Sequence, residues 1–288
     1  MRRKSDIRMN GQSVIDLIRR RTSVRTYSDK KIETFKLADM ETYLTYDWGN
    51  PFGAKVRFAL LHASSAPKRL GTYGLIHGMK VFFAGCVQKG DFDMEGFGFA
   101  FERAILYAQS LELETCWLGG TFRRSAFERM MQPNGEILPA ASPLGYAAAK
   151  KTLRERITAS TADARSRKPW NELFFDGDWQ TPLQPGDGAL KTCLEMVRIA
   201  PSASNKQPWR VLKSGDAVHF FLKETPGYTG NKAFGFCMQR IDMGIAACHF
   251  NLAANELQLG GEISIEDPEL LDPQQTGDGM SYSFTWKL

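Results

Sequence analysis

An internal repeat constrains the fold of this chain more than any other feature of its sequence. The stretch FGFAFERAILYAQSLELE (97–114) and the stretch MGIAACHFNLAANELQLG (243–260) carry apolar residues at matching positions along a fixed offset. Each has the spacing of an amphipathic helix, and each follows a predicted strand and a loop. Any two amphipathic helices share some pattern, but agreement over this length and in the order of neighbours favours a duplication.

The segments around these long helices recur in a similar order. In the first part, helices are predicted over 33–46, 97–111 and 123–131 and strands over 56–61, 80–84 and 137–148, while Ser13 can cap an earlier helix. In the second part, helices are predicted over 190–200 and 242–257 and strands over 209–213 and 217–223. We therefore predict an α+β fold with two similar sheet-and-helix halves, residues 1–182 and 183–288, packed through their long helices as a pseudo-dimer.

Composition excludes several classes of protein. The chain has 288 residues, 43% of them hydrophobic, but no run of about 18 apolar residues, so we expect a packed core and no membrane partner. A net charge of +5 is too small to indicate a nucleic-acid partner. The five cysteines form no CxxC pair, the four histidines lack metal-ligand spacing, and the basic N-terminal segment lacks a secretory core. These features predict a cytoplasmic protein without a metal site.

The segment Arg20 to Arg25 concentrates positive charge between the end of a helix and Tyr27. Guanidinium groups and hydroxyls at this spacing can bind a phosphate dianion through charge-assisted hydrogen bonds. The alternative is a solvated helix end at which arginine complements the helix dipole. Arg165 and Arg167 form a second basic cluster that can close over a phosphate, although surface charge is the more common explanation for such a run.

Two further segments are suited to a flat ligand. The stretch Ala200 to Trp209, APSASNKQPW, joins a predicted helix to a predicted strand with small residues and two side-chain amides. Small side chains let the backbone approach a ring, and amides offer a donor and an acceptor side by side. Gly119 and Gly120 likewise permit close approach. The alternatives are an ordinary loop and a tight turn.

Together these segments resemble the FMN-dependent nitroreductase family, in particular its fused tandem-repeat subgroup. Arg21-Thr22-Ser23-Val24-Arg25 matches the family's Arg-x-Ser-x-Arg turn, and Ala200 to Trp209 matches its Ala-Pro-Ser-x-x-Asn-x-Gln-Pro-Trp loop at every fixed position. The segment before Gly120 and the segment 167–173 also resemble family segments. In the ordinary family one chain carries both the turn and the loop, whereas here each half has only one of them. This division implies one composite site per chain, for which a monomer suffices, although further association remains possible.

The resemblance implies FMN as cofactor and NAD(P)H as co-substrate. By position, the cofactor-binding residues are Arg21, Thr22, Ser23, Arg25, Tyr73, Gly74, Gly119, Gly120, Arg165, Arg167, Pro201, Ser202, Ala203 and Asn205. We expect Tyr73 and Gly74 to contact the pyrimidine edge of the flavin, and we interpret Gln207 as structural. No catalytic side chain is nominated.

The implied activity is ping-pong hydride transfer, from NAD(P)H to FMN and then to a small electron-poor acceptor such as a nitroaromatic or a quinone. Alternatives on the same fold are reductive dehalogenation and flavin fragmentation. A further alternative is a flavin-binding redox sensor or storage protein without turnover.

Overall fold

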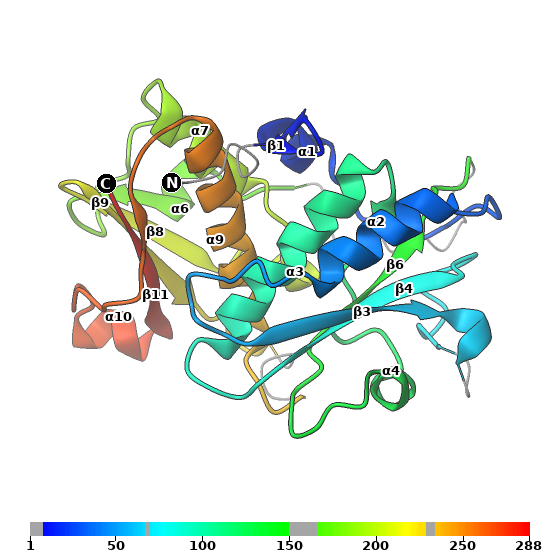
Figure 1. Cartoon of the computed structure of the whole chain (residues 1–288). Coiled ribbons are helices and arrows are strands. Elements are labelled where there is room, and N and C mark those ends of the chain that lie inside the picture. The colour runs from blue at the N-terminus through cyan, green and yellow to red at the C-terminus, as the bar shows by residue number, and fades with distance from the viewer. Residues whose placement is uncertain (1–7, 67–69, 150–165, 229–233) are drawn as a thin grey trace.

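The chain forms two halves, each with a sheet and helices, that lie side by side with their longest helices between them (Figure 1). The computed structural model describes residues 8–66, 70–149, 166–228 and 234–288. No helix within these ranges is both long and apolar enough to cross a membrane. The predicted α+β fold with two sheet-and-helix halves is confirmed.

The first half is built on an antiparallel sheet of four strands in the order β3-β4-β6-β5. These strands are β3 (Val56–His62), β4 (Val81–Val87), β5 (Glu114–Thr115) and β6 (Ala141–Gly145). Every residue of β4 is buried because helices cover both of its faces. Phe83 packs into the core that contains the long helix α3 (Asp93–Ser110), whereas Phe82 packs against Phe127 of α4 (Arg124–Met131).

The second half is built on a five-stranded sheet in the order β10-β11-β9-β8-β7. Its strands are β7 (Phe174–Asp176), β8 (Trp209–Ser214), β9 (Ala217–Lys223), β10 (Glu262–Ser264) and β11 (Met280–Lys287). β7 is parallel to β8, and the other pairs are antiparallel. β7 lies within the range predicted for the first half, so the chain crosses to the second sheet before the second repeat begins.

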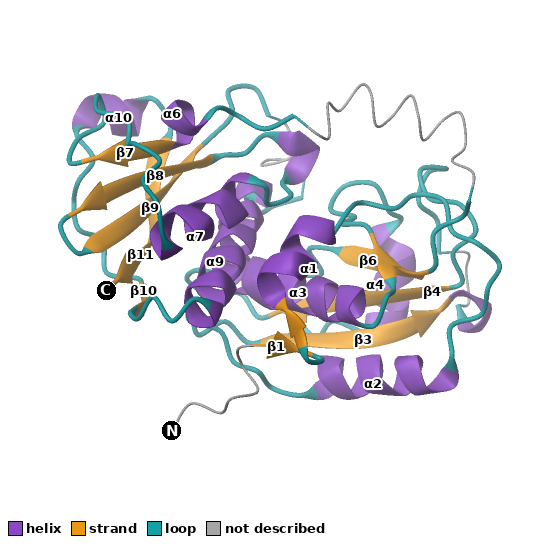
Figure 2. Ribbon diagram, turned by 90° about the horizontal axis from the view of Figure 1, so that it is seen from above, coloured by secondary structure: helices purple, strands orange, loops and turns teal. Residues whose placement is uncertain are grey.

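The remaining elements frame these sheets. They are the hairpin β1 (Arg8–Met9) and β2 (Gln12–Ser13), the helices α1 (Val14–Arg20), α2 (Thr34–Thr45), α6 (Trp170–Leu173), α7 (Ala189–Arg198), α9 (Met238–Glu256) and α10 (Pro273–Gly277), and the short 3-10 turns η2 (Ala63–Ser65) and η3 (Ala203–Asn205). Figure 2 shows α1 lying beside the central helices, and Ser13 accepts a hydrogen bond from Asp16 N as the predicted cap. Glu256 of α9 accepts hydrogen bonds from Val14 N and Ile15 N, so the second half holds the start of α1.

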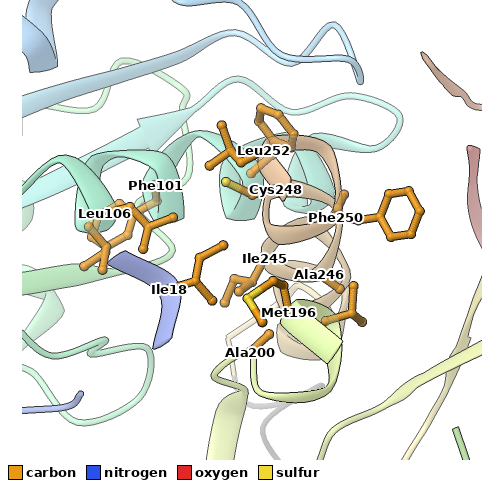
Figure 3. Close-up of a cluster of buried hydrophobic side chains, with 14 of the residues drawn as sticks. Ile18, Phe101, Leu106, Met196, Ala200, Ile245, Ala246, Cys248, Phe250 and Leu252 are labelled. Carbon is orange, nitrogen blue, oxygen red and sulfur yellow. The ribbon is translucent and has the colours of Figure 1, made fainter. Parts of the chain in front are cut away.

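The two long helices cross at glycines that occupy equivalent positions of the repeat. A Cβ atom at Gly98 of α3 would lie 2.2 Å from Ile241 O, and one at Gly244 of α9 would lie 2.0 Å from Glu95 O. Each glycine thus lets the backbone of the other helix approach. Around the crossing, side chains from α1, α3, α7 and α9 form one apolar cluster, which includes Ile18, Phe101 and Ile245 (Figure 3).

Several predicted boundaries were wrong. α3 begins at Asp93 and α9 at Met238, each four residues before the prediction, because the glycines and polar residues of the first turns interrupt the apolar pattern. The strand predicted over 137–148 is regular only in Ala141–Gly145. Residues 150–165, which belong to the predicted first half, lie outside the described residues.

Candidate functional site

A cavity of about 490 Å³ lies where the two halves meet. Ten of the predicted site residues line it: Arg21, Ser23, Arg25, Gly119, Gly120, Arg167, Pro201, Ser202, Ala203 and Asn205. The first five come from the first half, Arg167 from the arm that follows it, and the last four from the loop before β8. The volume is within the range of small-molecule and cofactor pockets, about 300–1,000 Å³.

Three predicted residues, Thr22, Tyr73 and Gly74, do not line the described cavity. Thr22 is exposed between two residues that line it. Tyr73 is 64% exposed, and Gly74 lies in the same turn, whereas the next residues, Leu75 and Ile76, line the cavity. Arg165 lies outside the described residues.

Most of the apolar residues that line this cavity were not predicted from the sequence. The missed lining residues are Leu75, Ile76, Cys116, Trp117, Leu118, Thr121, Ala140, Ser204, Tyr228, Phe234, Met238, Ile241, Asp242 and Ile245. The last four recur along α9 with the spacing of one helix face, which is a signal that the sequence contains. It indicates a buried face, but not that this face adjoins a cavity rather than the core.

Arg21 is held at the basic end of the cavity by the end of α1. Its backbone N–H donates to Leu17 O at 2.9 Å, and Val24 N donates to Thr115 O at 2.9 Å, which docks the turn on β5. The Arg21 side chain is 7% exposed, and its Nε has no hydrogen-bond partner within the described ranges. Among the described residues, this Nε makes an ion-pair contact with Glu102 Oε1 at 3.9 Å. A buried guanidinium with an open donor is suited to an incoming anion.

Glu102, beside Arg21 at the basic end of the cavity, contacts residues from both halves of the molecule. Its carboxylate accepts hydrogen bonds from Trp117 Nε1 at 2.6 Å and is 2.9 Å from Nε2 of His249. Nδ1 of His249 lies 2.9 Å from the carbonyl of Met196, which can only accept, so Nδ1 carries a hydrogen. The His249–Glu102 contact therefore contains one further proton, and the pair is completely buried. The spacing of the histidines in the sequence gives no indication of this contact.

The arm that carries Arg167 brings a second guanidinium to the cavity. Its Nη2 donates to Ile199 O at 3.1 Å and its Nη1 to Asn205 Oδ1 at 3.3 Å. Burial first, and then repulsion from Arg21 and Arg198, lowers the pKa of Arg167. Arg21 and Arg167 are thus like charges held near each other in a partly dehydrated site, and an anion between them would relieve that repulsion.

The loop before β8 is held in a strained conformation. Ser204, Asn205 and Gln207 all have φ near +50°, in the left-handed region that non-glycine residues adopt at a cost of order 1–3 kcal/mol. Hydrogen bonds offset that cost: Gln207 N donates to Ser202 Oγ at 2.9 Å, and Gln207 Oε1 accepts from Lys168 N at 2.8 Å. Gln207 is 3% exposed and absent from the cavity wall, which fits the structural role predicted for it.

At the opposite end of the cavity, the paired glycines pack against α9. A Cβ atom at Gly119 would lie 2.8 Å from Met238 Sδ. Gly119 O accepts a hydrogen bond from Arg124 Nη2 at 2.8 Å, and that guanidinium also lies over the Phe234 ring, 4.9 Å from its centroid. The backbone of this segment therefore forms the wall without a side chain between.

The two ends of the cavity lie at different positions along α9. Met238 contacts the glycine segment, Asp242 accepts from Ala203 N one turn later, and His249 reaches the Glu102–Arg21 group two turns after that. At about 1.5 Å of rise per residue, Met238 and His249 are roughly 16 Å apart along the axis. A ligand with an anionic tail and a flat head can lie along this helix, with its tail at Arg21 and its head near Gly119 and Ala203.

The sequence profile of the protein family described as "Putative TM nitroreductase" matches residues 13–254. The chain belongs to this nitroreductase family. It is similar to a crystal structure of a putative nitroreductase from Thermotoga maritima over 96% of this chain and 93% of that one, with a TM-score of 0.57 at 19% identity. That likeness shows the nitroreductase fold, as the sequence predicts. No curated protein matches the chain.

Two solved structures with bound FMN each cover about half of the chain. A nitroreductase with bound FMN from Bacteroides fragilis covers 49% of this chain and 91% of its own, with a TM-score of 0.38 at 18% identity. A nitroreductase in complex with FMN from Desulfovibrio desulfuricans covers 50% and 94%, with a TM-score of 0.35 at 18% identity.

This nitroreductase-family chain has a second cavity, of about 640 Å³. It lies at the loop between α2 and β3, which is the counterpart in the first half of the loop before β8. The Pro-Ser-Asn loop is absent there, and the two arginines that line this second cavity contact neighbouring groups. Arg57 donates to Glu136 Oε2 at 2.6 Å and to Met131 O at 2.9 Å, and Arg103 lies over the Trp48 ring. The arginine turn and the Pro-Ser-Asn loop are brought together only in the first cavity among the parts of the chain that the structure describes. Within the same parts, no cluster of three or more metal-ligating side chains is found.

Proposed function

We propose that this chain is an FMN-dependent oxidoreductase that binds one FMN in the cavity between its halves. The observation that carries the proposal is the composite wall, in which the Arg21–Arg25 turn of one half faces the Pro201–Asn205 loop of the other. Membership of the nitroreductase family supports it, and nitroreductase structures with bound FMN support this cofactor for the family.

The donor set fits a flavin mononucleotide. Arg21, Arg25 and Arg167 supply positive charge and Ser23 supplies a hydroxyl at one end, as a phosphate dianion requires. The unused Nε donor of buried Arg21 belongs to this end. The other end is mainly backbone and apolar side chains, as a flat ring requires. We assign the phosphate to the first set and the ring to Gly119, Gly120, Pro201, Ser202 and Ala203.

When bound, FMN supplies the chemistry of hydride and electron transfer. The chain itself binds and orients it, presents backbone N–H groups at the glycine segment, and keeps water from the apolar wall. Positive charge and N–H donors favour a ring that gains negative charge on reduction. We propose NADH or NADPH as the reductant and a flat, electron-poor small molecule, such as a nitroaromatic or a quinone, as the acceptor in a ping-pong sequence.

A monomer contains all the residues assigned to the cavity. We propose that it acts in the cytoplasm without a nucleic-acid or membrane partner and that it is active as a single chain.

Spectroscopy of the purified protein tests the proposal. We expect one FMN per chain, with a visible spectrum that NADH or NADPH bleaches under anaerobic conditions and that an added acceptor restores. Two FMN per chain would contradict the composite site. If neither nucleotide reduces the bound FMN, the result would favour a sensor or storage protein. If the protein takes up no FMN, the flavin assignment is wrong.

The phosphate assignment has a matched pair of variants. Loss of a charge-assisted hydrogen bond costs about 1.5–3 kcal/mol, so Arg25→Ala should weaken FMN binding roughly 10- to 150-fold by fluorescence titration. Arg19→Ala removes an arginine from the same helix end, where its side chain is 55% exposed and pairs with Asp16. It should leave the dissociation constant within about twofold. Equal effects of the two variants would contradict the assignment.

A further inference from the structure

Asp242 is a completely buried acid in the wall of the cavity. It lies on α9, is 2% exposed, and accepts a hydrogen bond from Ala203 N through Oδ1 at 2.9 Å. Its other oxygen, Oδ2, has no hydrogen-bond partner among the described residues. Nothing in the function proposed above uses this second oxygen, and a buried polar atom without a partner is costly unless a ligand supplies one.

The surroundings of Asp242 disfavour a charge. No ion pair is made to it within the described ranges, and its neighbours on the cavity face of α9 are Met238, Ile241 and Ile245. Burial raises the pKa of Asp242 well above its ordinary value, and the Ala203 N–H group lowers it only in part. The titratable group that faces it from outside α9 is the Tyr228 hydroxyl, which is a neutral acid at neutral pH.

The position of Asp242 fixes the end of the cavity that it serves. It contacts the loop residue Ala203 and lies one helical turn from Met238, which packs on Gly119. It lies two turns from His249, at the basic end. Asp242 therefore belongs to the end assigned to the ring and is remote from the end assigned to the phosphate.

We infer that Asp242 is protonated and that its Oδ2–H group donates a hydrogen bond to a carbonyl oxygen or ring nitrogen of the bound flavin. The inference rests on the proposed function, because the flavin is the acceptor. The acid keeps its proton, and no bond is made or broken at it. A neutral donor at this place favours a ring that gains negative charge, whereas an ionised carboxylate would oppose it. A carboxylic acid kept neutral by burial is a known way to place such a donor.

Two variants separate the donor from the acceptor function of the side chain. Asp242→Asn keeps an oxygen for Ala203 N and replaces the O–H donor with an N–H donor. Asp242→Ala removes both. Near-ultraviolet circular dichroism checks that each variant folds.

The first measurement needs no flavin. The infrared difference spectrum between wild-type apoprotein and Asp242→Asn should show the carbonyl stretch of one protonated carboxylic acid, which shifts in deuterated water. A carboxylate band in its place at neutral pH would overturn the inference.

The second measurement compares dissociation constants for oxidised and reduced FMN. Asp242→Asn should keep their ratio within about threefold of wild type. Asp242→Ala should weaken reduced FMN about tenfold more than oxidised FMN, which lowers the two-electron potential by about 30 mV. A role confined to holding Ala203 would weaken both forms equally and leave the ratio unchanged in Asp242→Ala.

The outcomes distinguish this inference from the proposed function. If the wild-type protein binds FMN but Asp242→Ala leaves the ratio unchanged, the donor is wrong and the flavoprotein assignment stands. If Asp242→Asn tightens reduced FMN tenfold relative to oxidised FMN, the wild-type acid is ionised and the inference is wrong. If the wild-type protein takes up no FMN, the proposed function fails together with the flavin acceptor, while the infrared band still decides the protonation state.

Discussion

Replacement of Gly244 by alanine should separate the two halves at the point where α3 and α9 cross. The added Cβ atom would lie 2.0 Å from Glu95 O and 2.8 Å from Phe99 N, where ordinary contact begins at 3.4 Å. Both contacts are backbone atoms of a helix, so a side-chain rotation cannot relieve them. The helices must move apart by more than an ångström, or one of them must bend.

The magnitude follows from two opposing terms. Overpacking of a well-filled core costs typically 1–3 kcal/mol and more where the clash is with backbone. Alanine in place of glycine inside a helix contributes about 1 kcal/mol in the opposite direction. Gly244 is not at positive φ, so no backbone strain enters. We expect a net loss of about 2 kcal/mol or more, and a melting temperature lower by roughly 5 °C for a chain of this size.

Differential scanning calorimetry measures the change, with Gly277→Ala as the control. Gly277 is the last residue of α10, and a Cβ atom there would meet no atom within 4 Å. Gly98→Ala should resemble Gly244→Ala because the two glycines are equivalent in the repeat, and the double variant should cost less than the sum of the two, since the helices separate only once. A melting temperature for Gly244→Ala equal to that of Gly277→Ala would refute the close crossing of backbones.

Two other predictions concern buried groups. Glu102→Gln removes the acid that His249 and Arg21 share. Because one partner of a buried pair is lost, the free energy of unfolding measured in urea should fall by about 3 kcal/mol. A free energy of unfolding equal to that of wild type would show that the pair is dispensable. Burial raises the pKa of Cys86 to about 11, above the ordinary value of 9.0, because the native state disfavours the thiolate. The unfolded chain therefore ionises first, and stability should fall as pH rises from about 9 towards 11 by this group's contribution. Cys86→Ala should flatten that part of the pH profile measured by urea unfolding, and an unchanged slope would contradict the assignment.

The sequence predicts those features of the fold that are local or periodic. The repeat located α3 and α9, and four family-like segments located ten residues of one cavity, because each is encoded in a short stretch. Pairings between distant residues could not be found in this way. His249 and Glu102 are separated by 147 positions, and neither has a local pattern that points to the other.

Some local patterns were also misleading or unused. The strand β11 at the C-terminal end lies inside the second sheet, between β10 and β9, yet no prediction covered it. The glycines at the start of α3 delayed its predicted beginning, since their packing role exists only when α9 is present. Asp242 reads as a polar residue at a helix start, and only its contact with Ala203 places it in the cavity wall.

The division of one cavity between two halves couples ligand affinity to the cohesion of the molecule. Arg21, Ser23 and Arg25 reach it from one side, and Pro201 to Asn205 from the other. A molecule that requires both sides binds only the assembled pair and stabilises it by RT ln(1 + [L]/Kd), about 2.7 kcal/mol at a hundredfold excess over Kd. By the same linkage, a substitution that loosens the crossing of α3 and α9 lowers the affinity for the ligand without contacting it. Substitutions at Gly98 or Gly244 would therefore weaken binding in an assay, although neither residue lines the cavity.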